Sequence, residues 1–341
     1  MSYETGSASS MSDLMNKLQI FAVANGWTLD QYNVESGSSV DGKLSIHKGS
    51  VYVHFLWNAN EANHIAMYQS LGYSGTGVSQ WLHTDDSGNG VTTLPGGTGW
   101  SDTVSTHDGY RFISSIGVGP FTAYHFFQGN GTNEYIHVAL EYAPFLYRNF
   151  GFGELEKAWD WTGGEYCYGH CQENSSPLIQ EPLLSANGDD SDSDRLATIH
   201  VEGLPNQPAA GKWGIFIEKS ETSLGSPFLD RAGENQVFFS GGSNGGPVGF
   251  LFNIVPGNSG DGFLPLTSNG IFYRDAVTAP DNLYFMGWQP DVKTLNMKNF
   301  SPGDEITVGS DTWMIFPYVR KQYTADLNES RNLGIAYKKI T

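Results

Sequence analysis

The chain has 341 residues, of which 39% are hydrophobic, 13% aromatic and only 16% charged, and its formal net charge is −18. The many aromatic residues exclude a disordered chain, and the negative charge disfavours nucleic acid as a partner, because binding to phosphates requires clustered lysine and arginine. The length suffices for roughly two domains.

Membrane insertion and secretion are not expected. No stretch approaches the length of apolar residues that a membrane span needs. The first ten residues, MSYETGSASS, are polar where a secretory signal needs a basic and then an apolar region, so we expect the protein to be made in the cytoplasm of the producing cell. Two cysteines, Cys167 and Cys171, are too few for a disulfide framework and lack the second ligand pair of a closed zinc site. We interpret them as ordinary structural cysteines.

A helix is predicted at about residues 12–24. Apolar side chains recur there at helical spacing, at Leu14, Leu18, Phe21 and Ala22. Ser12 is a suitable N-cap, and Asn25-Gly26 is a suitable end. The polar arm before the helix, residues 1–10, has too few apolar groups to order itself, so another surface must hold it if it is ordered.

After the helix the apolar pattern changes to alternation. Residues 43–47 and 51–57 flank a short turn at 48–50 and are typical of a β-hairpin, and a strand is predicted at 64–71. The composition of residues 72–109 predicts long loops with short strands. Further strands are predicted at 110–116, 122–128, 134–142, 213–218, 236–240, 249–255, 270–274, 282–287, 305–309, 312–318 and 334–338.

Many short strands and frequent turns predict a mainly β fold, with two β-sandwich-like or barrel-like domains and one N-terminal α-helix. Residues 171–210 hold seven acidic residues and one basic residue, which is typical of an exposed connection. The predicted organisation is an N-terminal arm and helix (1–35), a first β domain (36–170), an acidic connecting segment (171–210) and a second β domain with a basic C-terminal end (211–341).

Three histidines and one acidic run are the candidate metal ligands of the sequence. If the turn after residue 128 centres on Gly131, His125 lies opposite His137, and with His54 they could bind zinc. However, no HExxH motif accompanies them, and aromatic-rich sheets also contain hydrogen-bonded histidines. The acidic run at 190–194 lacks the glycine and the glutamate of an EF-hand loop. We therefore predict no metal site.

Four carboxylates lie close in sequence to Trp159 and Trp161, at Glu154, Glu156, Asp160 and Glu165. Paired carboxylates beside rings that stack on a sugar are compatible with glycoside hydrolysis, whereas the alternative is that the tryptophans are core or interface anchors. The chain has no GxSxG, P-loop or dinucleotide-binding motif in a suitable context. We favour the alternative, and predict a protein that is not an enzyme and has no cofactor.

Three blocks of the sequence carry a resemblance to a known class of proteins. They are MSYETGSASSMSDLMNKLQIFAVANGW at the start, YHFFQGNGTNEYIHVALEYAPFLYRNFGFGELEKAWDWTGGEYCYG in the middle and DTWMIFPYVRKQYTADLNESRNLGIAYKKI at the end. Together they resemble virion structural proteins of tailed bacteriophages, in particular a tail-associated class. The resemblance implies a non-enzymatic structural protein of the virion, which forms a homo-oligomer and contacts other virion proteins in the tail, baseplate or neck.

The alternative function is a receptor-binding or glycan-binding protein at the tail tip, with a host surface glycan as its partner. An exposed row of tryptophans would favour binding, and tryptophans buried between subunits would favour assembly. The basic C-terminal end could dock on an acidic neighbour, or its lysines could protect a strand edge. The candidate interface residues are Trp57, Trp159, Trp161, Arg320, Lys321, Lys338 and Lys339.

Overall fold

The computed structural model describes residues 2–34, 42–58, 64–70, 72–73, 83–84, 90–91, 119–129, 131–169, 195–201, 214–218, 236–239, 266–274, 283–296, 299–317 and 333–340. Within them the fold is mainly β, with an α-helix near the N-terminus, as the sequence predicts. The predicted strands 110–116 and 249–255, the acidic run at 190–194, Cys171, Arg320 and Lys321 lie outside the described residues.

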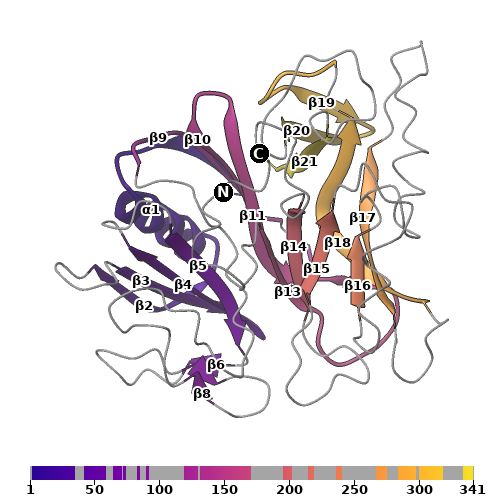
Figure 1. Ribbon diagram of the computed structural model, residues 1–341, viewed down its shortest axis with the longest axis horizontal. Helices are drawn as coiled ribbons and strands as arrows, with labels where there is room; N and C mark the ends of the chain where they lie inside the picture. Colours follow the sequence, from indigo (N-terminus) through magenta and orange to yellow (C-terminus); the bar gives the residue numbers. More distant parts are fainter. Residues whose placement is uncertain are drawn as a thin grey trace.

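A central sheet forms the middle layer of the molecule (Figure 1). Its strands lie in the order β1 (Tyr3–Ala8), β9 (Phe121–Phe127), β10 (Tyr135–Ala143), β11 (Leu146–Glu154), β13 (Glu165–Gly169), β14 (Arg195–Val201) and β15 (Gly214–Glu218). Strand β14 lies inside the predicted connecting segment, and β15 lies inside the predicted second domain. One continuous sheet therefore joins parts that we expected to be separate, because strand pairing brings together segments far apart in the sequence.

One face of the central sheet is covered by the helix α1 (Met11–Ala24) and an N-terminal sheet. The strands of this sheet follow the chain order, β2 (Thr28–Val34), β3 (Gly42–Lys48), β4 (Val51–Asn58) and β5 (His64–Ser70). The predicted hairpin at 43–57 is confirmed, because β3 pairs with β4 from Lys48 and Val51 onward. A small sheet of β6 (Gly72–Tyr73), β7 (His83–Thr84) and β8 (Gly90–Val91) follows.

The other face is covered by a C-terminal sheet, which faces the central sheet as in a β-sandwich (Figure 1). Its strands lie in the order β16 (Gln236–Phe239), β17 (Thr267–Arg274), β18 (Leu283–Asn296), β21 (Leu333–Lys339), β20 (Asp311–Pro317) and β19 (Glu305–Val308). The short strand β12 (Glu156–Lys157), which connects β11 to β13 of the central sheet, pairs with β18. The C-terminal sheet is thus joined to the central sheet through β12.

Successive residues of the central strands point into different cores. Phe126 and Val138 belong to the cluster beneath α1 and the N-terminal sheet. Their neighbours Phe127 and Ala139 belong to the cluster against the C-terminal sheet. A strand that is buried on both faces has no polar side, which explains why the predicted strands 122–128 and 134–142 are almost continuous apolar runs.

The helix confirms the prediction with a different N-cap. Its N-cap is Ser10, whose hydroxyl accepts a hydrogen bond from the backbone N–H of Asp13 at 3.1 Å. The predicted N-cap, Ser12, lies in the first turn instead, where its hydroxyl accepts a hydrogen bond from Trp57 Nε1 at 2.9 Å. Periodicity alone placed the helix correctly. It did not decide between the two serines as N-cap, because Ser12 bonds to Trp57 and Ser10 caps the helix.

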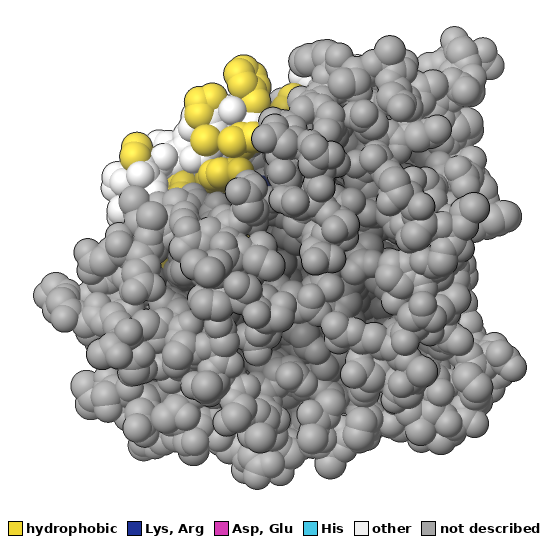
Figure 2. Space-filling view, viewed as in Figure 1, with side chains coloured by type: hydrophobic (Ala, Val, Ile, Leu, Met, Phe, Trp, Pro, Cys, Tyr) yellow, Lys and Arg dark blue, Asp and Glu magenta, His cyan; other side chains and the backbone are white. Residues whose placement is uncertain are grey.

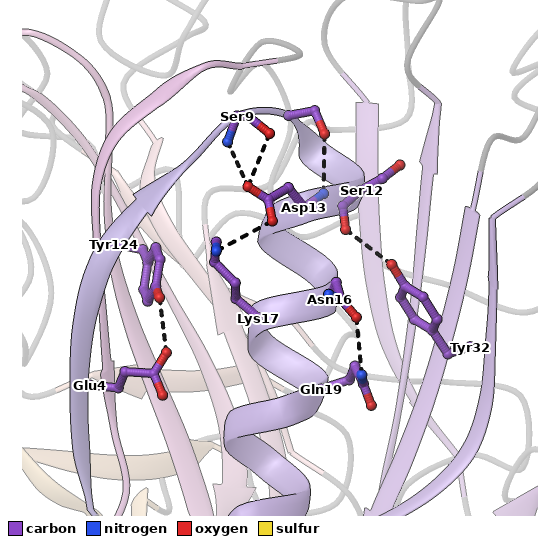
Figure 3. A network of polar contacts seen from close by, with 10 residues as sticks. Glu4, Ser9, Ser12, Asp13, Asn16, Lys17, Gln19, Tyr32 and Tyr124 are labelled. Atoms are coloured by element: carbon purple, nitrogen blue, oxygen red, sulfur yellow. Dashed lines mark hydrogen bonds and ion pairs between the residues drawn. The ribbon is translucent and has the colours of Figure 1, made fainter.

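Polar contacts hold the N-terminus of α1 in place (Figure 3). The carboxylate of Asp13 accepts hydrogen bonds from the backbone and the hydroxyl of Ser9, at 2.8 and 3.1 Å, and lies 3.4 Å from Lys17. The backbone hydrogen bond from Ser9 contributes most to holding the pKa of this carboxyl below its usual value. On the other side of the helix, the Tyr32 hydroxyl donates to the carbonyl of Ser12 at 3.1 Å.

The N-terminal arm is ordered by its own chain. Strand β1 pairs with β9, and the Tyr3 hydroxyl lies 3.0 Å from His125 Nδ1. The Tyr3 ring lies 5.1 Å from the ring of Phe127, and Lys339 of the C-terminal sheet lies 4.7 Å above it. The surface that holds the arm is therefore β9, and Tyr3 contacts both the central sheet and the C-terminal sheet.

Replacement of Tyr3 by Ala is expected to lower the free energy of unfolding by about 2 kcal/mol, because a half-buried ring and its hydrogen bond are lost. Tyr3→Phe keeps the ring and isolates the hydroxyl, with an expected loss of about 1 kcal/mol. Urea unfolding of both variants measures the difference. An Ala variant as stable as the native chain would contradict this account of the arm.

The predicted register between β9 and β10 is wrong by two residues. His137 lies opposite Phe127, and His125 lies opposite Ala139. The turn centres one residue later than Gly131, which moves every cross-strand partner by two positions. Gln128 at the start of this turn is held by contacts outside the hairpin, from its own N–H to the carbonyl of Ser2 at 2.8 Å and from Trp27 Nε1 to its side chain at 3.0 Å.

Candidate interaction surfaces

Four aromatic side chains gather where the connection between β11 and β13 crosses the C-terminal sheet. Trp159 and Trp161 belong to the connection, and Phe285 and Trp288 belong to β18. The ring centroids of the two connection tryptophans are 6.1 Å apart, and those of the two β18 rings are 4.6 Å apart in an edge-to-face arrangement. Trp159 and Trp288 are 44% and 37% exposed, whereas Trp161 is buried. We call these four residues the aromatic patch.

The connection between β11 and β13 can pair with β18 because Gly287 has no side chain in its way. Strand β12 places Lys157 opposite Gly287, and the next residue, Ala158, donates its N–H to the carbonyl of Met286 at 3.0 Å. Gly287 has φ +151°, and a Cβ at this position would lie 2.3 Å from the carbonyl oxygen of Glu156. Only glycine fits this conformation and this close approach. The pairing of β12 with β18 therefore depends on Gly287.

A bulge in β18 brings Phe285 and Trp288 to the same side of the sheet. Residues three apart on a regular strand point to opposite faces. In the pairing with β17, Phe272 lies opposite Phe285 but Ile271 lies opposite Gly287, so β18 has one extra residue there. Such a bulge re-aims the following side chain, and the two aromatic rings come into contact.

Hydrogen bonds orient the two connection tryptophans. Trp159 Nε1 donates to the carbonyl of Phe285 at 3.0 Å, and Trp161 Nε1 donates to the carbonyl of Met286 at 3.3 Å. The Trp161 ring also lies 5.5 Å from Lys157 Nζ. Because its N–H is already bonded to the protein, the exposed indole of Trp159 presents an apolar ring face to solvent.

The four carboxylates of the hydrolase interpretation lie around this connection. Glu154 lies opposite Glu165 on the backbone ladder of β11 and β13, and its carboxylate is 3.5 Å from Lys157 Nζ. Glu156 and Asp160 are exposed. The structure thus places the carboxylates near Trp159 and Trp161, as their spacing in the sequence indicates. Glycoside hydrolysis remains the less favoured interpretation.

A second exposed aromatic lies at the tip of the β10–β11 hairpin. Ala143 pairs with Leu146, so Pro144 and Phe145 form the turn. Phe145 is 73% exposed, the most exposed large hydrophobic side chain among the described residues. Figure 2 shows hydrophobic side chains gathered over the end of the molecule where this hairpin reaches the surface. We call residues 143–146 the hairpin tip.

The backbone of the hairpin tip is unusual for its sequence. Phe145 has φ +64°, and its N–H donates to the carboxylate of Glu141 at 2.9 Å. Proline followed by a positive φ is the pattern of a type II turn, in which the second position normally holds glycine or asparagine. A bulky residue with positive φ is a genuine outlier. We did not single out Phe145 from the sequence, although an apolar Ala-Pro-Phe-Leu run between two strands was a usable signal.

The candidate interface residues have different outcomes. The prediction that Trp57 is an interface residue is wrong, because its side chain is fully buried beneath α1 and is not on a surface. Trp161 is buried within the aromatic patch, and Trp159 is exposed. Arg320 and Lys321 lie outside the described residues.

The two C-terminal lysines contact carboxylates of their own chain. Lys338 Nζ lies 3.1 Å from Asp311 and 3.8 Å from Asp291, and Lys339 Nζ lies 2.7 Å from Glu305. Their strand, β21, pairs with β18 on one side and β20 on the other, so it is not an edge strand. The predicted protection of a strand edge is therefore wrong for Lys338 and Lys339. Docking of the basic C-terminal end on an acidic neighbour stays a prediction.

The histidines of the zinc interpretation are not brought together. His54 is buried in the N-terminal sheet, where its Nδ1 lies 3.0 Å from the Ser45 hydroxyl. His125 and His137 face the C-terminal sheet, where His125 lies beside Phe316 and His137 beside the carbonyl of Pro290. They are not opposite each other on the ladder of β9 and β10. No group of three or more histidine, cysteine or acidic side chains that could hold a metal occurs among the described residues. Cys167 is buried in the core beneath α1.

A chain of buried polar groups crosses the contact between the central and C-terminal sheets. His137 Nε2 lies 2.9 Å from the carbonyl of Pro290, and its Nδ1 lies 3.1 Å from the Tyr168 hydroxyl. The Tyr168 hydroxyl lies 3.1 Å from that of Tyr337, which donates to Asn149 Oδ1 at 3.3 Å. Burial lowers the pKa of His137 to about 3, so its ring is neutral at pH 7. The carbonyl of Pro290 can only accept, so Nε2 carries the proton.

Comparison with known proteins does not assign this chain to a family. No protein family model matches it. No curated protein is significantly similar to it. Among the described residues, no helix has the length and the apolar character needed to cross a membrane.

Proposed function

We propose that this chain is a non-enzymatic structural subunit of a tailed bacteriophage particle. It assembles with copies of itself and with other virion proteins in the tail, baseplate or neck. Support comes from the resemblance of the three sequence blocks. Further support comes from the hairpin tip, which presents an aromatic side chain to solvent in a strained backbone conformation.

The observation that carries the proposal is Phe145. A residue other than glycine in the left-handed region costs roughly 1–2 kcal/mol, and Phe145 at φ +64° is also 73% exposed. Neither property helps an isolated subunit to fold. Burial of a phenylalanine side chain stabilises by about 1.5–3 kcal/mol, so insertion of Phe145 into an apolar site on a neighbouring subunit would offset the strain.

Replacement of Phe145 by Gly is expected to separate folding from assembly. Glycine adopts a positive φ without strain, so the free energy of unfolding should rise by about 1 kcal/mol. Loss of the ring should remove the contact with the neighbouring subunit, so the variant should be absent from particles produced in cells that supply only the variant gene. Urea unfolding measures the first effect, and immunoblotting of purified particles measures the second.

Phe145→Tyr is the matched control, because it keeps the ring, the exposure and the strain. It should be incorporated into particles as well as the native chain. Normal incorporation of the Gly variant would contradict the role of the hairpin tip. Absence of the native chain from purified particles would refute the proposed function as a whole.

A further inference from the structure

The aromatic patch has the properties of a ligand site rather than of a protein interface. Its exposed rings are Trp159 and Trp288. In the C-terminal sheet and the β11–β13 connection, Val308 is the only other exposed large hydrophobic residue among those the structure describes. A stable protein interface buries about 800 Å² on each partner. Two rings surrounded by polar residues are too small for the apolar centre of such an interface.

The rings are held ready for a flat, partly apolar ligand. The N–H of Trp159 is bonded to the carbonyl of Phe285, and the ring of Phe285 packs against Trp288 at 4.6 Å. Because these contacts restrain the rings before any ligand binds, little side-chain entropy remains to be lost. The exposed faces carry the negative side of the aromatic quadrupole, which attracts positively polarised C–H groups such as those on the face of a sugar ring.

The polar residues around the rings match the hydroxyls of a sugar. Glu156 and Asp160 are exposed on the same segment as Trp159. Carboxylates only accept hydrogen bonds, and sugar hydroxyls can donate to them. Lys157 is the basic residue of the segment, and it already contacts Glu154 at 3.5 Å and the carbonyl of Trp161 at 3.3 Å.

The charge around the patch selects against acidic sugars. Residues 154–165 contain four acidic residues and one basic residue. A polyanionic saccharide would be repelled by this surface, whereas an uncharged saccharide would not. We propose that the aromatic patch is a binding site for neutral hexose units of a polysaccharide, which stack on Trp159 and Trp288. This proposal does not depend on the position of the protein in a particle.

The test uses the full chain and linear hexasaccharides of glucose, galactose and mannose, with hexagalacturonate as the acidic counterpart. Tryptophan fluorescence and isothermal titration calorimetry measure binding. At least one neutral hexasaccharide should bind, and hexagalacturonate should bind at least about tenfold more weakly. Trp159→Ala and Trp288→Ala should each weaken binding by about tenfold or more, because each removes one stacking surface.

Val308→Ala is the matched control, because it removes an exposed apolar side chain from the same sheet outside the patch. Its affinity should equal that of the native chain. Trp159→Phe and Trp288→Phe keep an aromatic face and should retain part of the binding, which separates loss of stacking from loss of folding. No binding of any neutral hexasaccharide at millimolar concentration would overturn the proposal. Undiminished binding by the Trp159→Ala, Trp288→Ala double variant would also overturn it.

Discussion

Acidification from pH 7 to about pH 4 is expected to destabilise the folded chain by about 3 kcal/mol for each of two buried histidines. Burial lowers the pKa of His137 to about 3, and burial together with Lys339 lowers that of His125 to about 4. In the unfolded chain both groups have the ordinary pKa of about 6.5. At a pH between the folded and the unfolded pKa, protons therefore bind the unfolded chain more strongly than the folded chain.

The free energy of unfolding falls on acidification because of this preference for the unfolded chain. Above about pH 6.5 both histidines are neutral in both states, and the full stability is present. As the pH falls below 6.5 the unfolded chain takes up protons that the folded chain does not, so the free energy of unfolding falls by up to about 1.4 kcal/mol per pH unit for each group. The loss from His125 ends near its folded pKa of about 4, and that from His137 near about 3.

Urea unfolding at a series of pH values from 4 to 8 measures this dependence. His137→Gln removes one titrating group, while its amide N–H can still donate towards the carbonyl of Pro290. The variant should be less stable at pH 7, because the contact with Tyr168 is lost, but its pH dependence should be shallower by about one proton. If the slope between pH 4 and 6 is unchanged in a variant that also carries His125→Asn, the buried histidines do not cause the acid sensitivity.

Replacement of Gly287 by Ala is expected to lower the free energy of unfolding by about 3 kcal/mol. The added Cβ would lie 2.3 Å from the Glu156 carbonyl oxygen, in a residue with φ +151°. Either β12 must move away from β18 or the backbone of β18 must change. In both cases the hydrogen bond from Trp159 to Phe285 is disturbed, so a shift of tryptophan emission should accompany the loss of stability.

Gly303→Ala is the matched control for this variant. Gly303 also has a positive φ, at +85°, but no atom lies within 4 Å of a Cβ at that position. Its replacement should cost only the conformational penalty of about 1 kcal/mol. The difference between the two variants, measured by urea unfolding, is the contribution of the close approach of β12. Equal losses would show that Gly287 is needed for its φ alone.

Local pattern in the sequence was sufficient for the class of the fold and for most of the strands. The helix follows from apolar residues at helical spacing, and the hairpin at residues 43–57 follows from alternation around a short turn. Both depend on neighbours a few positions apart, which is the range over which backbone periodicity acts. The proximity of carboxylates to Trp159 and Trp161 was visible for the same reason.

The tertiary structure decided which surfaces these elements share. Trp57 is an aromatic residue like Trp159, yet one lies beneath α1 and the other at the surface. Lys338 and Lys339 form a basic pair in the sequence, yet carboxylates from β19, β20 and β18 pair with them. The pairing of β12 with β18 joins segments more than 100 residues apart. The bulge that brings Phe285 to Trp288 depends on how β18 pairs with β17. Composition and spacing determine which groups a chain carries, but burial and charge pairing depend on long-range packing, which no local pattern reports.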